Sequence, residues 1–157
     1  DEIPFELLQD PEAIANWPLT LSRDGARTPM PWADAPGGGF TRGTPWLPLS
    51  GANLARAVAG QEGDRDSLLH FTRQVLALRK AHPALRRGAL VECASEGPLL
   101  RFVREHAGER VACAFNFGRE AAPLAMADGA GEPILALGGA RDGLLPGYSA
   151  LWTRLTP

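Results

Sequence analysis

Residues 23–32 read RDGARTPMPW and combine two arginines, one carboxylate, two prolines and one tryptophan. Pro29 and Pro31 fix two φ angles and remove two backbone donors, so this stretch is incompatible with regular helix or sheet. A stiff, charged loop of this kind is suited to presenting side chains to a ligand. The alternative is a structural loop held together by arginine–aspartate pairs.

Composition excludes several classes of protein. The chain has 157 residues, long enough for one ordinary domain or two small ones, and carries a net charge of −2. Without a run of lysine and arginine, it lacks the basic surface that nucleic acids or acidic membranes attract, so neither is expected as a partner. No apolar run approaches the roughly 18 residues that span a bilayer. We therefore expect a soluble, cytoplasmic protein, with Cys93 and Cys113 as buried, reduced thiols.

The first part of the chain, residues 1–63, is rich in proline and glycine and shows little periodicity. One short helix is expected over residues 11–17, with Asp10 as its cap and Pro11 in its first position. Long irregular segments are usually functional and packed on a scaffold. The chain opens at Asp1 without methionine. We therefore expect that residues 1–63 cover a body lying upstream of this sequence.

A helix is the clearest prediction after this segment. Apolar residues recur at helical spacing, and Asp64 or Asp66 is the expected N-cap. Pro83 should end the helix. The apolar stripe, which needs an apolar partner, consists of Leu68, Phe71, Val75 and Leu78.

Beyond Gly88 the pattern changes to short strands separated by turn residues. The expected strands cover residues 89–93, 99–104, 110–116, 122–126, 134–137 and 149–155. This spacing predicts a small antiparallel β-sandwich.

Four collinear motifs resemble one family. The loop 23–32 is similar to the RDGxRTPMPW segment after the eighth barrel strand of α-glucosidases and oligo-1,6-glucosidases in the α-amylase superfamily. Its lead-in IPFELLQDP, residues 3–11, also resembles that family. Further matches are GFT at 39–41 with PWLPL at 45–49, and the last barrel helix at 67–88. The resemblance is strong over residues 1–88.

The resemblance implies a retaining glycosidase built on a (β/α)8 barrel, in which a nucleophile and an acid/base carboxylate act together. In the resembled enzymes the nucleophile, the acid/base and a third, stabilising aspartate lie at the ends of the fourth, fifth and seventh strands, upstream of Asp1. The fold class implied is α+β: irregular loops and the last barrel helix over residues 1–87, then an antiparallel β-sandwich over residues 88–157. We expect no catalytic residue in this chain, and no activity from it alone.

The expected contribution is substrate binding, because loops at this face of a barrel form the active site. By the resemblance, Arg27 binds the terminal glucose of an α-glucosidic oligosaccharide and an aspartate of the barrel. Arg23 and Asp24 are further candidates, with bracing of the loop as their favoured role. Trp32 could stack on a sugar, although a packing role is the commoner use of tryptophan.

Other residues carry weaker signals. His70 and His82 lack partners at metal-ligand spacing, so no metal or cofactor is expected. The glycines 37–39 are interpreted as a flexible loop rather than a phosphate cradle. Isolated carboxylates are interpreted as caps or turn residues: Asp64, Asp66, Glu92, Glu96, Asp128 and Asp142.

Two functional hypotheses of different classes remain open. The favoured one is the C-terminal part of an α-glucosidase that removes terminal glucose. The alternative is a non-catalytic β-sandwich module that binds carbohydrate or protein. Such modules display exposed aromatic side chains, whereas the aromatic residues after Gly88 stand mostly at strand positions, which favours a core role for them.

Overall fold

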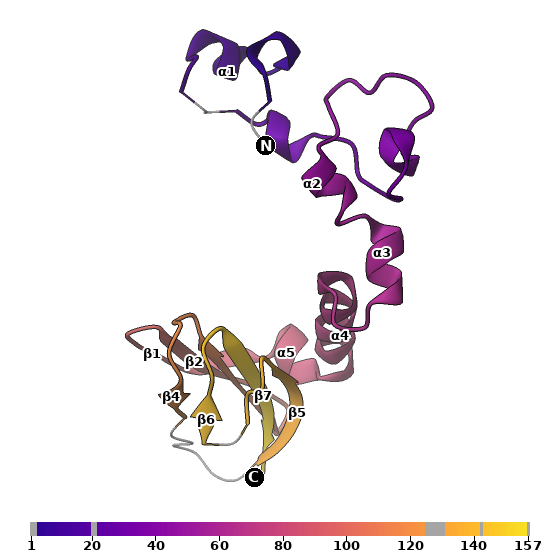
Figure 1. Ribbon diagram of the computed structural model, residues 1–157. Coiled ribbons are helices and arrows are strands. Elements are labelled where there is room, and N and C mark those ends of the chain that lie inside the picture. Colours follow the sequence, from indigo (N-terminus) through magenta and orange to yellow (C-terminus); the bar gives the residue numbers. More distant parts are fainter. Residues whose placement is uncertain (1–2, 20–21, 125–130, 142, 157) are drawn as a thin grey trace. The chain divides into compact units, whose positions relative to one another are not determined.

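The structure is a computed structural model that describes residues 3–19, 22–124, 131–141 and 143–156 (Figure 1). It divides into two compact units, Asp1–Arg73 and Gln74–Pro157. Each is considered by itself.

The first unit consists of short helical turns joined by irregular chain. Its helices are α1 (Pro11–Ala15), α2 (Gly51–Leu54), α3 (Val58–Gly63) and the first part of α4 (Leu68–Ala81), and its 3₁₀ turns are Phe5–Leu7, Asp24–Ala26 and Pro36–Gly39. The Asp10 side chain caps α1 by accepting from the Glu12 amide, and Pro11 occupies the first helical position. The predicted helix, its cap and its first residue are confirmed, but the helix ends at Ala15 rather than at residue 17.

The glycine run, interpreted from the sequence as a flexible loop, forms a hydrogen-bonded turn in the structure. Gly37 and Gly38 have φ angles of 71° and 63°, which glycine adopts without strain. The Gly38 carbonyl accepts from the backbone amides of Trp32 and Ala33 at 2.7 and 3.0 Å. The turn therefore holds the segment that carries Trp32.

Helix α4 begins one residue after its true cap, Ser67, whose hydroxyl accepts from the His70 amide at 3.4 Å. Asp64 and Asp66 were the predicted caps, and both are wrong. The Asp64 carboxylate instead accepts from the Asp66 amide in the preceding turn. Of the predicted stripe, Leu68 is 72% exposed, whereas Phe71, Val75 and Leu78 are half-buried.

The helix ends at Ala81, and Pro83 opens the short helix α5 (Pro83–Arg87). The effect predicted for this proline is confirmed. His82 lies between the two helices and contacts the Glu109 carboxylate through Nδ1 at 2.7 Å. It is therefore a histidine at a helix end, as the sequence indicates.

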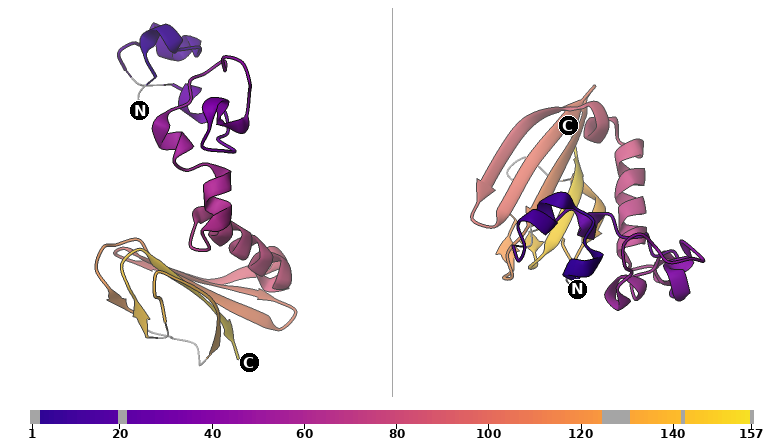
Figure 2. Two further views of the ribbon diagram at one scale, coloured as in Figure 1. Left: turned by 45° about the vertical axis from the view of Figure 1, so that its right-hand side comes forward. Right: turned by 90° about the horizontal axis from the view of Figure 1, so that it is seen from above.

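The second unit is a β-sandwich. Its larger sheet is antiparallel and has the order β1-β2-β3-β7-β5, and a second sheet pairs β4 with β6 (Figure 1). Figure 2 shows the twist of the larger sheet from two further sides. The strands are β1 (Ala89–Glu96), β2 (Leu99–His106), β3 (Glu109–Asn116), β4 (Ala122–Pro123), β5 (Gly131–Leu137), β6 (Leu144–Leu145) and β7 (Ser149–Leu155).

Each predicted strand overlaps a strand of the sandwich, although β1 and β5 extend three residues further than predicted. Two further differences concern the smaller sheet. The strand predicted over residues 122–126 is described only at Ala122–Pro123, and Met126 lies outside the described residues. Strand β6 was not predicted, because two residues are too few to show a period of two.

Apolar side chains between the two sheets form the core of the sandwich. Leu145 and Leu151 are 0% and 1% exposed, and Ala114, Leu124 and Ala140 complete the cluster. The opposite face of the larger sheet carries an aromatic group in which Phe115 stacks on Phe102 and meets the edge of Trp152. An antiparallel sandwich is therefore confirmed.

Helix α5 packs against one end of β2 and β3. Ala84 is fully buried there, and its amide donates to Glu109 at 2.8 Å. Burial raises the pKa of the Glu109 carboxyl, but the Ala84 amide and the His82 imidazole outweigh this effect and leave the pKa below its usual value.

The two cysteines differ. Cys113 in β3 is buried, and burial raises the pKa of its thiol to about 12. Cys93 lies on the edge strand β1 and is exposed, so the prediction that both thiols are buried is wrong for Cys93. An apolar neighbourhood in sequence does not bury a side chain on a strand that has a neighbour on one side only.

Candidate substrate-binding loop

Two aspartates tie the loop 22–32 to the segment before α1. The Asp24 carboxylate accepts from the backbone amides of Gln9 and Asp10 at 2.8 and 2.9 Å. In return, the Asp10 carboxylate accepts from the Arg23 backbone amide at 2.9 Å and from its Nε and terminal nitrogen at 2.9 and 2.7 Å. We call Asp10, Arg23 and Asp24 the reciprocal clamp.

Within the clamp, Asp10 and Arg23 each stabilise the charged form of the other. Hydrogen bonds from Arg23 hold the pKa of the Asp10 carboxyl well below its usual range, and the same pairing raises the pKa of Arg23. The side chain of Asp10 is fully buried, whereas that of Arg23 is 60% exposed. A buried carboxylate needs such partners, because an unpaired charge is costly to remove from water.

Asp24 is fully buried, and its Oδ1 has no hydrogen-bond partner among the described residues. The bracing role expected for Arg23 and Asp24 agrees with this geometry, but the partner differs. Arg23 pairs with Asp10, 13 positions away, rather than with the adjacent Asp24. Sequence reasoning treated Asp10 only as a helix cap and missed its second role.

Arg27 follows the 3₁₀ turn formed by Asp24–Ala26, and its amide donates to the Asp24 carbonyl at 2.9 Å. Its side chain is exposed, and the described part of the chain provides no hydrogen-bond partner for its guanidinium. The clamp therefore fixes the backbone immediately before Arg27 while the cation itself faces solvent.

Trp32 is 52% exposed, so it is not the buried anchor that is the commoner use of tryptophan. Its backbone is held on both sides: its amide donates to Gly38, and its carbonyl accepts from Ala59 at 3.0 Å. The Pro31 carbonyl likewise accepts from the Val58 amide at 2.9 Å. The first unit thus presents an arginine and an indole from one braced loop.

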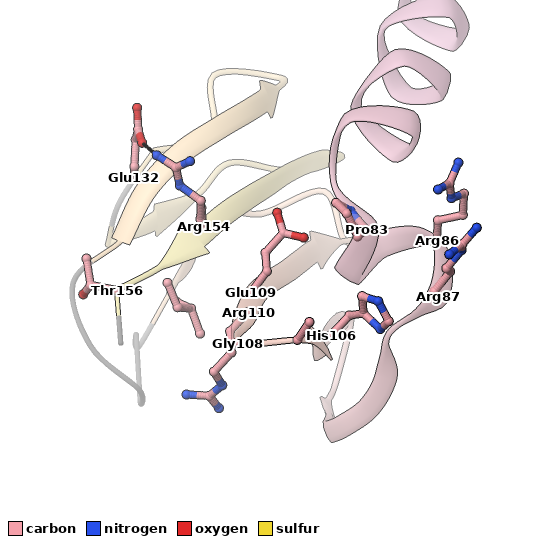
Figure 3. Close-up of a pocket in the computed structure, with 12 residues that line it drawn as sticks. Pro83, Arg86, Arg87, His106, Gly108, Glu109, Arg110, Glu132, Arg154 and Thr156 are labelled. Atoms are coloured by element: carbon pink, nitrogen blue, oxygen red, sulfur yellow. Dashed lines mark hydrogen bonds and ion pairs between the residues drawn. The ribbon is translucent and has the colours of Figure 1, made fainter.

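The second unit contains a cavity of about 690 Å³ beside α5 and the turn between β2 and β3 (Figure 3). Both carboxylates that line it are already paired: Glu109 with His82 and Ala84, and Glu132 with Arg154. The cavity therefore offers no pair of uncommitted carboxylates for acid/base chemistry.

Within the described ranges there is no group of three or more histidine, cysteine or carboxylate residues arranged to hold a metal ion. None of the helices described there is long and apolar enough to cross a membrane.

Comparison with known families gives two adjacent matches. Residues 2–88 match the family described as alpha amylase, catalytic domain, and residues 86–152 match a domain of unknown function, DUF3459. The chain belongs to the α-amylase family, and its described fold fits the end of such a barrel followed by a β-rich domain.

Individual relatives are glycosidases and glucosyl-transfer enzymes. The chain is 45% identical over 159 residues to a probable alpha-glucosidase of Rhizobium meliloti, covering 98% of this chain and 29% of that protein. It is 35% identical to a probable oligo-1,6-glucosidase 2 of Bacillus subtilis, covering 75% of this chain and 21% of the relative.

Among solved structures, the alpha-glucosyl transfer enzyme XgtA matches with a TM-score of 0.89 and 44% identity, over 99% of this chain and 30% of that one. The chain therefore spans less than a third of the length of these proteins. It resembles α-glucosidases and related glycoside hydrolases of the α-amylase family.

Proposed function

We propose that this chain supplies the substrate-binding loop and the terminal β-sandwich of an α-glucosidase. The enzyme would remove terminal α-linked glucose from oligosaccharides by a retaining mechanism. One observation carries this proposal: Arg27 is exposed and unpaired among the described residues, directly after a clamp that fixes its backbone.

Guanidinium chemistry suits the role proposed for Arg27. Its planar fork can donate to a sugar hydroxyl and to a carboxylate at the same time. Because the clamp and the two prolines already restrict the loop, little conformational freedom is lost when a sugar binds. Trp32 would add stacking against a sugar face at a position further from the cleaved bond.

The carboxylates beside Arg27 are proposed to support binding and not to cleave the glycosidic bond. A retaining mechanism needs a nucleophile and an acid/base whose carboxyl groups lie about 5–5.5 Å apart on either side of the bond. Asp10 and Asp24 are both fully buried and hold backbone amides. The catalytic pair would therefore come from parts of the catalytic domain outside these residues.

The proposed domain boundary follows residue 87. Residues 1–87 would complete the catalytic barrel, and residues 88–157 would form the sandwich. Gly88 supports a junction there, because a side chain added at this position would lie 2.3 Å from the Ala84 carbonyl. The close turn between α5 and β1 thus depends on glycine.

The full-length protein provides the test. With p-nitrophenyl α-glucoside as substrate, it should release glucose whose first-formed anomer is α, observed by NMR before mutarotation. Absence of hydrolysis, or β-glucose as the first product, would contradict the proposal. Inactivity would favour the alternative of a non-catalytic sandwich module.

Glucosyl transfer is a second candidate, because the alpha-glucosyl transfer enzyme XgtA shares 44% identity with this chain. The same assay separates the two activities when an acceptor alcohol or sugar is added. A transferase would form glucosylated acceptor faster than free glucose, whereas a hydrolase would form mainly glucose.

A further inference from the structure

Two exposed aromatic residues stand on chain segments that are joined at one end of the larger sheet. Phe117 follows β3 and is 64% exposed, and Tyr148 precedes β7 and is 63% exposed. The Tyr148 amide donates to the Gly118 carbonyl at 2.9 Å, which brings the two segments together. Strands β3 and β7 are neighbours in this sheet.

The backbone of Tyr148 is strained. Its φ angle is 53°, a left-handed conformation that side chains other than glycine rarely adopt. The preceding Gly147 is required by packing, because a Cβ atom there would lie 2.0 Å from the Arg119 carbonyl. Strain of this kind at an exposed residue is a pointer to function, since nothing about burial explains it.

Both rings are held by neighbouring side chains. Phe117 lies parallel to Phe115, with centroids 6.1 Å apart and planes 8° from parallel. Phe115 in turn meets the edge of Trp152 at 5.4 Å. The Tyr148 hydroxyl accepts from Arg119 Nε at 3.3 Å. The rings are therefore presented with few conformations left to lose on binding.

We propose that Phe117, Tyr148 and Arg119 form a sugar-binding surface within the second unit. Aromatic rings stack on the apolar faces of pyranoses, and an exposed guanidinium donates to sugar hydroxyls. This pairing of rings with a polar donor favours a sugar over a protein partner, whose interfaces need a much larger apolar area. The expected ligand is a soluble α-glucan chain.

The proposal depends on the proposed function only for the choice of α-glucan. The test is affinity electrophoresis of the full-length protein in native gels that contain soluble starch. The wild-type protein should migrate more slowly as starch is added. Phe117→Ala and Tyr148→Gly should weaken this retention by about three- to tenfold in apparent Kd, the range expected when one aromatic stacking contact is lost.

Tyr148→Gly separates binding from folding. Glycine removes the strain at this position, so the variant should unfold at the same temperature as the wild type or higher while binding starch less well. Tyr148→Phe keeps the ring and should retain most of the binding. The matched control is Leu90→Ala, because Leu90 is an exposed apolar residue on β1, 58% exposed and remote from both rings.

Hydrolysis of p-nitrophenyl α-glucoside should be unchanged in all these variants. The proposal would be overturned if starch did not slow the migration of the wild-type protein. It would also be overturned if starch slowed the wild type and Tyr148→Gly equally. Aggregation or unfolding of Phe117→Ala accompanied by normal retention of Tyr148→Gly would overturn it as well, because the rings would then serve packing. An inactive protein with variant-sensitive retention would reject the proposed α-glucosidase function and leave this surface intact.

Discussion

Different interactions stabilise the interior of each unit. In the first unit the fully buried side chains include two carboxylates, Asp10 and Asp24, which hold backbone amides at defined distances. In the second unit no carboxylate is among the fully buried side chains of the described residues, and the apolar Leu145 and Leu151 lie between two sheets. Hydrogen bonds are directional and apolar contacts are not. The first unit is therefore suited to orienting a ligand group, and the second to providing stability.

The comparison predicts separable effects. Damage to the sandwich should lower stability and leave the chemistry of each folded molecule intact. Damage to the clamp should lower activity in molecules that remain folded. Each prediction below is measured on the full-length protein.

The largest expected loss of stability is in the sandwich core. Leu151→Ala removes a side chain that is 1% exposed, so the sandwich should lose about 2–5 kcal/mol of unfolding free energy, measured by urea titration. Leu137→Ala, at a position 38% exposed on β5, should cost clearly less. An equal loss of unfolding free energy in the two variants would show that Leu151 does not belong to the core of the sandwich.

The clamp should affect activity most strongly among positions that do not touch substrate. Asp10→Asn removes the charge that holds Arg23, so the loop carrying Arg27 should lose its fixed position. We expect kcat/KM for p-nitrophenyl α-glucoside to fall by about tenfold to a hundredfold. Asp64→Asn changes an exposed turn aspartate in the same unit and serves as the control.

A normal kcat/KM in Asp10→Asn would refute the positioning role of the clamp. Loss of folded protein, measured by circular dichroism, would make the clamp structural instead. A lower kcat with an unchanged KM would show that the clamp stabilises the sugar only in the transition state.

Acid should weaken the junction between α5 and the sheet. The Ala84 amide and the His82 imidazole hold the pKa of the Glu109 carboxyl below its usual value, so the contribution of Glu109 to stability is present above that value and is lost as pH falls through the lowered pKa. The difference in unfolding free energy between the wild type and Glu109→Gln should therefore shrink as pH falls below the usual glutamate pKa. Parallel pH profiles of the two proteins would contradict this assignment.

The smallest effect concerns the cysteines. Cys93 is exposed, whereas Cys113 is buried with a thiol pKa raised to about 12. Iodoacetamide should modify Cys93 in the native protein and reach Cys113 only after denaturation, as peptide mass spectrometry would show. Rapid native labelling of Cys113 would mean that β3 opens readily.

Local signals in the sequence predicted much of the fold. Alternation of apolar residues located β2 and β3, and the Asp10–Pro11 pair located α1. The cap of α4 was misplaced because Asp64, Asp66 and Ser67 are all competent caps within four residues. Only the three-dimensional path of the chain selects Ser67.

The candidate site was predicted less completely. The motif drew attention to Arg27 and Trp32, and both prove exposed. The pairing of Asp10 with Arg23 joins positions 13 residues apart across irregular chain, where no periodicity predicts contact. Exposure of Phe117 and Tyr148 was likewise missed, because both residues stand next to strands whose other aromatic residues are packed.

The central claim is that Arg27, held in position by the clamp, binds the terminal glucose of the substrate. Its most direct measurement is kcat/KM for p-nitrophenyl α-glucoside in Arg27→Ala, compared with Arg65→Ala, which removes another exposed arginine of the first unit. Loss of charged hydrogen bonds to the sugar predicts a decrease of about a hundredfold for Arg27→Ala and none for Arg65→Ala. Equal activity in the two variants would contradict the account.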